Sequence, residues 1–223
     1  MSDYRAILKP MLDKSEGFRD SVYFDAKQNP SIGYGFNLND PANKELLRLN
    51  GISLEGLYNG DKLTPEQADL LRNHSIDRKE KELRSNLSDD VFDNLQPHQQ
   101  AALQSLNYNS NKLIGPKLKQ YLADGDHLNL AKEVLTNSNP KKDLGTLVRR
   151  TDEASKYLND DDSSVKDMFR NLNLEDHAKI QGILNNTDNE NVKREYLDKY
   201  DKYLNQSNAQ PLQFNKLFTN PSN

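Results

Sequence analysis

The sequence predicts a mainly α-helical α+β fold with two lobes, a small N-terminal β-hairpin or sheet, a long interlobe helix and a helical C-terminal lobe. Three observations predict it. Apolar residues recur at helical spacing along most of the chain, strand-forming residues gather near residues 22–34, and residues 65–87 combine a clear helix start with a long polar pattern. With 34% hydrophobic and 29% charged residues, the 223-residue chain can form a core, though not a large one.

The first helix and the sheet are predicted from residues 3–36. An apolar stripe at residues 7–12 predicts a helix that is capped at Ser2 or Asp3 and ends near Lys14. Glu16 then stands at or just beyond the helix end. Strand formers on both sides of the turn-rich "AKQNP" predict a short antiparallel hairpin.

The interlobe helix has the clearest start in the sequence. Thr64 is a suitable N-cap, Pro65 suits the first helical position, and Gln67 completes a capping box. The many charges that follow are typical of a helix that joins two lobes. Further helices are predicted at "QQAALQSLNYN", "GPKLKQYLADG", "LNLAKEVLTNS" and "LGTLVRRTDEASKYL".

These elements divide the chain at a linker-like run, "NDDDSS". We expect a domain at 1–158, with lobes at about 1–63 and 88–158 joined by the helix at about 65–87. Residues 159–223 are predicted to be a helical accessory segment with a flexible tail. We expect this segment to position the protein and to be dispensable for its chemistry.

A tyrosine face is the main feature of the accessory segment. Tyr196, Tyr200 and Tyr203 lie on one side of a predicted helix. They pack either on the body of the protein or on another partner, and packing on the body is favoured because exposed aromatic stripes promote aggregation.

Charge and composition exclude several classes of protein. The formal net charge is −4, and lysine and arginine are dispersed, so a nucleic-acid surface is not expected. The absence of cysteine fits a reducing compartment. The N-terminus lacks a signal-peptide pattern and no segment has the length of a membrane span, so we expect synthesis in the cytoplasm and no stable membrane insertion.

Two acids with unlike surroundings form the candidate catalytic pair. Glu16, near the negative end of a helix and beside apolar residues, suits a proton donor, whereas Asp25, beside polar residues, suits an ionised partner. Ser31 can hold a water molecule, and Gly33 and Gly35 leave the strand edge bare for a ligand. The alternative is that both acids are solvated surface groups and the glycines only form a turn.

The order of these residues resembles the phage-type lysozymes. That family's signature is E-G-x-R, then Y-x-D, then T-I-G-x-G, and here "EGFR", "YFD" and "SIGYG" follow in that order and spacing. "LTPEQADLLRNHSIDRKEKEL" resembles the family's interlobe helix, "QQAALQSLNYN" its A-L-x-S-F-x-F-N segment, and "LGTLVRRTDEA" its G-L-x-x-R-R-x-x-E helix. The resemblance covers residues 5 to about 158.

The resemblance implies a role for each matching residue. Glu16 would be the general acid, Asp25 the base or electrostatic partner, and Ser31, at the family's usual threonine position, the holder of the attacking water. An arginine of the last matching helix would approach Glu16, and Arg149 and Arg150 are both candidates. The residues assigned to substrate binding are Tyr23, Gly33, Gly35 and Asn109.

Three departures from the family pattern affect these roles. Ser31 keeps the hydroxyl but lacks the methyl group that restricts the threonine rotamer. Phe36 stands where the family commonly has histidine, so an ion pair there is lost. The chain is acidic, whereas free lysins of the family are often basic.

The implied activity is muramidase activity on bacterial peptidoglycan. It would cleave β-1,4 bonds between N-acetylmuramic acid and N-acetylglucosamine with inversion. A lytic transglycosylase acting on the same bond and a non-catalytic wall-binding module of the same fold are the alternatives. Four scattered histidines without ligand spacing and the lack of a phosphate loop predict no metal and no cofactor.

The route to the wall is left open by the residues. Release by a holin as an endolysin, carriage in a bacteriophage virion and specialised secretion would each deliver a chain like this one. Residues 159–223 are the candidate contact for a virion protein or another protein partner. Fractionating virions from lysate distinguishes these routes.

Overall fold

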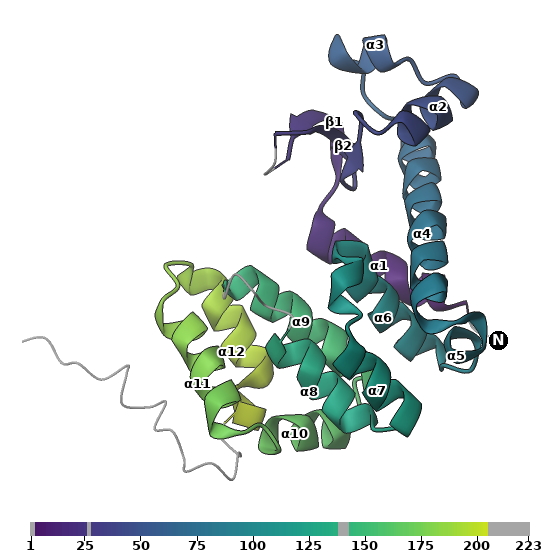
Figure 1. Cartoon of the computed structure of the whole chain (residues 1–223). Coiled ribbons are helices and arrows are strands. Elements are labelled where there is room, and N and C mark those ends of the chain that lie inside the picture. The colour runs from purple at the N-terminus through teal and green to yellow at the C-terminus, as the bar shows by residue number, and fades with distance from the viewer. Residues whose placement is uncertain (1–2, 26–27, 138–142, 205–223) are drawn as a thin grey trace, which may run out of the picture.

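The protein is bilobed, and one long helix connects its lobes (Figure 1). The computed structural model describes residues 3–25, 28–137 and 143–204. The predicted flexible tail, at residues 205–223, lies outside the described residues. The mainly helical α+β fold with a small sheet agrees with the prediction.

The small lobe contains an antiparallel sheet and two helices. Its elements are β1 (Arg19–Phe24), β2 (Pro30–Gly33), β3 (Phe36–Asn37), α2 (Pro41–Leu49) and α3 (Leu54–Tyr58). The strand order is β1-β2-β3, with Tyr23 opposite Ser31 and Ile32 opposite Phe36. The predicted hairpin is therefore confirmed, and a short third strand extends it.

The turn between β2 and β3 requires glycine. Gly33 has a φ of 64° and Gly35 a φ of 79°, in the region where a side chain is strained. After the turn, Phe36 is buried in the small core. The side chain that replaces the family's usual histidine is thus a packing residue.

Helix α4 (Pro65–Leu87) joins the lobes as the sequence predicts. Thr64 and Gln67 form the capping box, in which the Gln67 backbone N–H donates to the Thr64 hydroxyl oxygen at 3.3 Å. Near its start the helix contributes Leu71 to the small core, and closer to its end it contributes Ile76 and Leu83 to the large core. A single helix therefore contributes to both cores.

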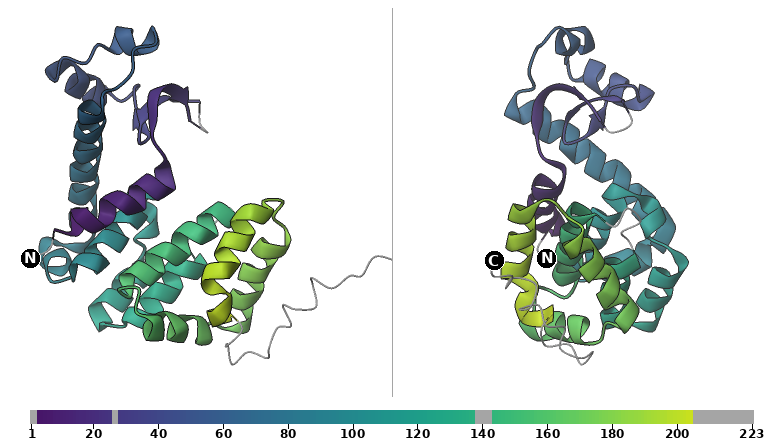
Figure 2. Two further views of the ribbon diagram at one scale, coloured as in Figure 1. Left: turned by 180° about the vertical axis from the view of Figure 1, so that it is seen from behind. Right: turned by 90° about the vertical axis from the view of Figure 1, so that its left-hand side faces the viewer.

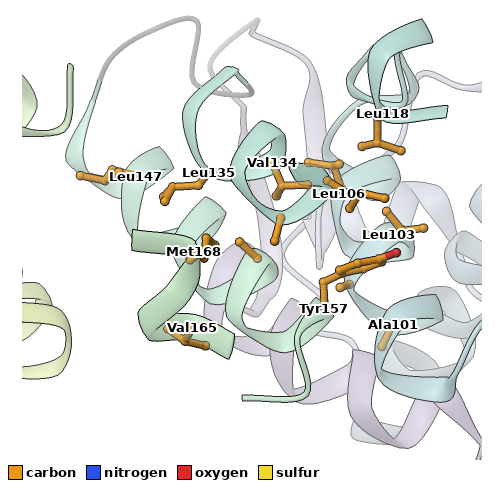
Figure 3. Close-up of a cluster of buried hydrophobic side chains, with 14 of the residues drawn as sticks. Ala101, Leu103, Leu106, Leu118, Val134, Leu135, Leu147, Tyr157, Val165 and Met168 are labelled. Atoms are coloured by element: carbon orange, nitrogen blue, oxygen red, sulfur yellow. The ribbon is translucent and has the colours of Figure 1, made fainter. Parts of the chain in front are cut away.

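The large lobe is a bundle of helices around a continuous apolar core. The helices that precede residue 158 are α1 (Tyr4–Glu16), α5 (Asp89–Asp93), α6 (Pro97–Asn109), a short 3-10 helix (Asn111–Leu113), α7 (Pro116–Asp124), α8 (His127–Asn137) and α9 (Leu144–Tyr157). Figure 3 shows part of the core, where Leu103 and Leu106 of α6 lie near Tyr157 of α9 and Val134 of α8. Helix α6 packs against α1, α4 and α9, so it lies at the centre of the lobe.

Three helices follow residue 158 and share this core. They are α10 (Asp162–Arg170), α11 (Leu174–Asn185) and α12 (Glu190–Leu204). Helix α10 packs against α8, whereas α11 and α12 pack against α9 (Figures 1 and 2). Val165 and Met168 appear in the same cluster as Tyr157 in Figure 3. The division at residue 158 stays a prediction that truncation tests.

The tyrosine face packs on the body of the protein, as favoured above. Tyr196 and Tyr200 are 2% exposed and Tyr203 is 8% exposed. The ring of Tyr203 stacks on Phe169 of α10, with the ring centroids 5.7 Å apart. The tyrosines are therefore interior residues of the bundle.

Candidate active site

Glu16 is the last residue of α1 and lies where the chain leaves the large lobe. Asp3 caps the other end of this helix through its carboxylate, and Leu8 and Leu12 are fully buried against the large core. The helix ends because Gly17 adopts a φ of 67°. The chain then continues directly into β1 (Figure 1). The Glu16 side chain is half-buried at this junction, with 24% of its surface exposed.

Arg149 of α9 holds the Glu16 carboxylate. Its Nη1 lies 2.6 Å from Glu16 Oε1, its Nε lies 3.1 Å from Glu153 Oε1, and its Nη2 donates to the Ser105 carbonyl at 3.1 Å. Burial opposes the charged guanidinium, but the charges of Glu153 and Glu16 outweigh it and raise the pKa of Arg149. Arg149 therefore stays charged and fixed by three acceptors.

Arg150 takes a different place in the same network. Its Nη2 donates to Asn109 Oδ1 at 2.5 Å, and its Nη1 pairs with Glu153. Consecutive helical residues point about 100° apart, and although both arginines contact Glu153, their other contacts differ: Arg149 reaches Glu16 and Arg150 reaches Asn109. Of the two candidates, the structure pairs Arg149 with Glu16.

Glu153 is the buried centre of this network. Only 1% of its surface is exposed, and its carboxylate accepts bonds from the Ser105 hydroxyl at 2.7 Å, from Arg149 and from Arg150. A buried carboxylate needs such partners. We assigned no role to Glu153 from the sequence. Its spacing of three and four residues from two arginines on one helix is the signal that identifies it.

Asp25 and Ser31 lie together on the small sheet, joined through Asn29. Asp25 Oδ1 accepts the Asn29 backbone N–H at 2.8 Å, and Oδ2 accepts the Asn29 side-chain amide at 3.2 Å. Ser31 is 1% exposed, and its hydroxyl donates to the Asn29 carbonyl at 3.4 Å. Asn29, to which we gave no role, therefore connects the acid and the hydroxyl.

Tyr23 belongs to β1, the strand that separates Glu16 from Asp25 in the sequence. It stands opposite Ser31 on β1, and the Arg19 guanidinium lies 4.6 Å from the centre of its ring. Burial raises the pKa of Tyr23, Arg19 opposes this rise, and the charges of Glu16 and Asp25 both add to it. Tyr23 is thus near enough to both acids for their charges to act on its hydroxyl.

The other residues predicted to bind substrate, Gly33, Gly35 and Asn109, differ in their exposure and lie on different elements. Gly35 is exposed at the turn, and a Cβ there would lie 4.0 Å from the Tyr23 hydroxyl, whereas Gly33 is buried against Leu63. Asn109 is exposed at the end of α6, beside Arg150. Gly33 and Gly35 are accounted for by the turn that they form, and their contact with substrate stays a prediction.

Tyr108 connects the two lobes beside this site. Its hydroxyl donates to the Tyr34 carbonyl at 3.5 Å, and Tyr34 in turn lies under the Arg72 guanidinium of α4. Burial raises the pKa of Tyr108 to about 12, and the Glu16 charge adds to the effect. Tyr108 therefore stays protonated as a donor near the acid at neutral pH.

A groove of about 900 Å³ adjoins Arg149. It lies among α1, α6, α9 and α12, and its lining includes Lys14, Ser105, Arg149, Asp152 and Lys199. Glu16 and Asp25 are outside this lining, so the groove is a neighbour of the acid pair rather than its enclosure.

The comparison with protein families decides the identity. The family model described as "Phage lysozyme" matches residues 13–154, well over half of the chain. The chain belongs to the phage lysozyme family. The match contains both acids, Ser31 and both arginines, and it ends before α10.

A solved structure supports the fold of this phage lysozyme family member. The muramidase domain of SpmX from Asticaccaulis excentricus superposes with a TM-score of 0.50 at 20% sequence identity, over 69% of this chain and 95% of that domain. At this identity the likeness concerns the fold. The search of curated proteins gives no match.

Within residues 3–25, 28–137 and 143–204, no group of three or more histidine, aspartate or glutamate residues is placed to hold a metal ion. The same part of the chain contains no helix that is long and apolar enough to cross a membrane.

Proposed function

We propose that this member of the phage lysozyme family is a muramidase that hydrolyses the β-1,4 bond between N-acetylmuramic acid and N-acetylglucosamine in bacterial peptidoglycan. One observation carries the proposal. A half-buried glutamate, Glu16, is held by Arg149 at the lobe junction, a second carboxylate, Asp25, is held by Asn29 beside the small sheet, and the charges of both act on Tyr23. Two carboxyl groups with different surroundings are what glycoside hydrolysis requires.

Glu16 is the proposed general acid. It would donate its proton to the oxygen of the leaving sugar, and Arg149, 2.6 Å away, would stabilise the carboxylate that remains. Because Arg149 is itself fixed by Glu153 and by the Ser105 carbonyl, the carboxyl group has a defined orientation before substrate binds.

Asp25 and Ser31 are proposed to direct water. The Asp25 carboxyl group accepts both Asn29 donors, and as a carboxylate it would accept a proton from water or stabilise positive charge on the sugar. Ser31 would hold the water through its hydroxyl. Attack by this water opposite the protonated bond inverts the anomeric centre in a single displacement.

The test is a single substitution, Glu16→Gln, which keeps the shape of the side chain and removes the proton donor. Turnover of purified peptidoglycan should fall by more than the roughly 10²–10⁴-fold of an auxiliary acid. Glu45→Gln is a matched control, because Glu45 is also paired with an arginine but lies on the surface of α2. Near-normal turnover by folded Glu16→Gln would overturn the proposal. No turnover by the folded wild type would instead favour a non-catalytic wall-binding module.

The products separate hydrolysis from the alternative chemistry. If water is the nucleophile, the new reducing end appears first as the α-anomer, which NMR detects before mutarotation. Mass spectrometry that finds mainly 1,6-anhydro-muropeptides would instead identify a lytic transglycosylase, which needs no attacking water.

A further inference from the structure

Asp152 of α9 joins three elements of the large lobe. Its Oδ2 lies 2.5 Å from Lys14 Nζ of α1, and its Oδ1 lies 2.7 Å from Lys199 Nζ and accepts the Tyr200 hydroxyl at 2.7 Å. Burial would raise the pKa of Asp152, but hydrogen bonds from Lys14, Lys199 and Tyr200 outweigh it, and the pKa is lowered. Asp152 is therefore a charged junction between α1, α9 and α12.

The junction lies beside the contact between Glu16 and Arg149. Asp152 follows Arg149 by three residues on α9, and Lys14 precedes Glu16 by two residues on α1. The same two helices are thus joined twice, once by Glu16 with Arg149 and once by Lys14 with Asp152. Movement of Asp152 would change the place of the helix end that carries Glu16.

Helix α12 fixes the far side of the junction. The Tyr196 hydroxyl lies 3.3 Å from the Thr151 hydroxyl, one residue before Asp152. The Tyr200 ring is buried among Tyr196, Tyr203 and Phe169. Lys14 and Lys199 are more than half exposed, so water and salt screen their charges. The Tyr200 hydroxyl is the buried, salt-insensitive anchor of Asp152.

We propose that Asp152 and Tyr200 are positioning residues for Glu16, with Lys199 in support, so that α12 belongs to the catalytic apparatus although it lies beyond the family match. The inference rests on the proposed function. It gives residues 190–204 a role inside the enzyme, in addition to any role in locating it at the wall. Neither residue touches substrate or the reacting atoms in this scheme, because both act through α1 and α9.

The same helix supplies a matched control. Three residues after Lys199 and Tyr200, Lys202 and Tyr203 make the same pair of contacts with Asp162, at 2.6 and 2.7 Å. Asp162 belongs to α10, which carries no residue of the candidate site. The two tyrosines therefore make bonds of the same length to an aspartate, although Asp162 is more exposed than Asp152, and only the bond of Tyr200 leads to α1.

The experiment compares Tyr200→Phe with Tyr203→Phe in the full chain, on soluble glycan strands from peptidoglycan. We expect a similar small fall in Tm for both. The kcat of Tyr200→Phe should fall about threefold to tenfold with KM unchanged, below the roughly 10²-fold that a 1 Å misplacement costs. The kcat of Tyr203→Phe should stay at the wild-type value. Equal kcat values for the two variants would overturn the inference.

A double-mutant cycle gives the second test. Lys14 and Tyr200 share Asp152 but lie on different helices, so the effects of Lys14→Met and Tyr200→Phe on kcat should be non-additive. Strictly additive effects would contradict coupling through Asp152. Because the Lys14 side chain is exposed, the Lys14→Met variant is expected to fold. A wild-type kcat for Lys14→Met would also contradict the proposed coupling of Asp152 to Glu16.

The wild type and Glu16→Gln are assayed beside these variants, so that failure of the positioning role can be distinguished from failure of the proposed function. An active, Glu16-dependent wild type with identical Tyr200→Phe and Tyr203→Phe variants refutes only the positioning role. An inactive wild type, or one that does not need Glu16, refutes both.

Discussion

Replacing Glu153 by leucine should destabilise the large lobe strongly. The side chain is 1% exposed and its carboxylate neutralises Arg150, which is also 1% exposed. Removing one member of a buried ion pair costs about 3–5 kcal/mol, because the remaining charge stays in a site of low polarity. For a chain of this size, about 1 kcal/mol corresponds to roughly 2–4 °C in Tm, so the expected fall is about 6–20 °C.

The assay is urea unfolding followed by circular dichroism, with a thermal melt as a second measurement. Glu153→Leu combined with Arg150→Met should recover most of the loss, since an apolar pair of similar volume can replace a buried ion pair. Glu45→Leu, at an exposed ion pair, is the control and should change little. A loss below about 1 kcal/mol in Glu153→Leu would refute the view that Glu153 compensates buried charge.

Two further predictions concern the accessory helices and pH. A chain that ends at Leu158 should lose cooperative unfolding, because removing α10, α11 and α12 exposes the faces of α8 and α9 that they cover. If this fragment instead folds cooperatively and needs Glu16 for activity, the predicted division at residue 158 is supported. Because the pKa of Asp152 is lowered in the folded protein, its carboxylate should stabilise the fold at pH values above the ordinary aspartate pKa of about 3.9. This stabilisation should be lost as the pH falls through the lower pKa that Asp152 has in the folded state. Between pH 5 and pH 2, the urea midpoint of Asp152→Asn should therefore change less with pH than that of the wild type. Parallel plots of midpoint against pH for the two proteins would contradict this.

The elements with strong local signals were predictable from the sequence. The long helix occupies Pro65–Leu87 because its cap, its proline and its polar pattern all specify the same start. The hairpin was predictable because strand formers flank a turn. The two-residue strand β3 was missed because Phe36–Asn37 is too short to show an alternating pattern.

The contacts of the site depend on tertiary geometry that a single sequence does not specify. The choice between Arg149 and Arg150 depends on how α9 is rotated relative to α1, and helical periodicity alone leaves that rotation undetermined. Asn29 was missed because polar turn residues usually serve only the turn. The role of Asp152 depends on Lys14 and Tyr200, which are more than 180 residues apart in the sequence.

The position of Glu16 at the end of α1 has a consequence for how the candidate site is assembled. Glu16 ends a helix that packs in the large core, whereas Asp25 and Ser31 belong to the small lobe. Their separation therefore depends on how the two lobes are placed relative to each other as well as on the packing inside each lobe. In the proposed mechanism, opening the lobes to admit a glycan strand would also separate Glu16 from Asp25 and Ser31, so that the proposed site would be assembled only in the closed molecule.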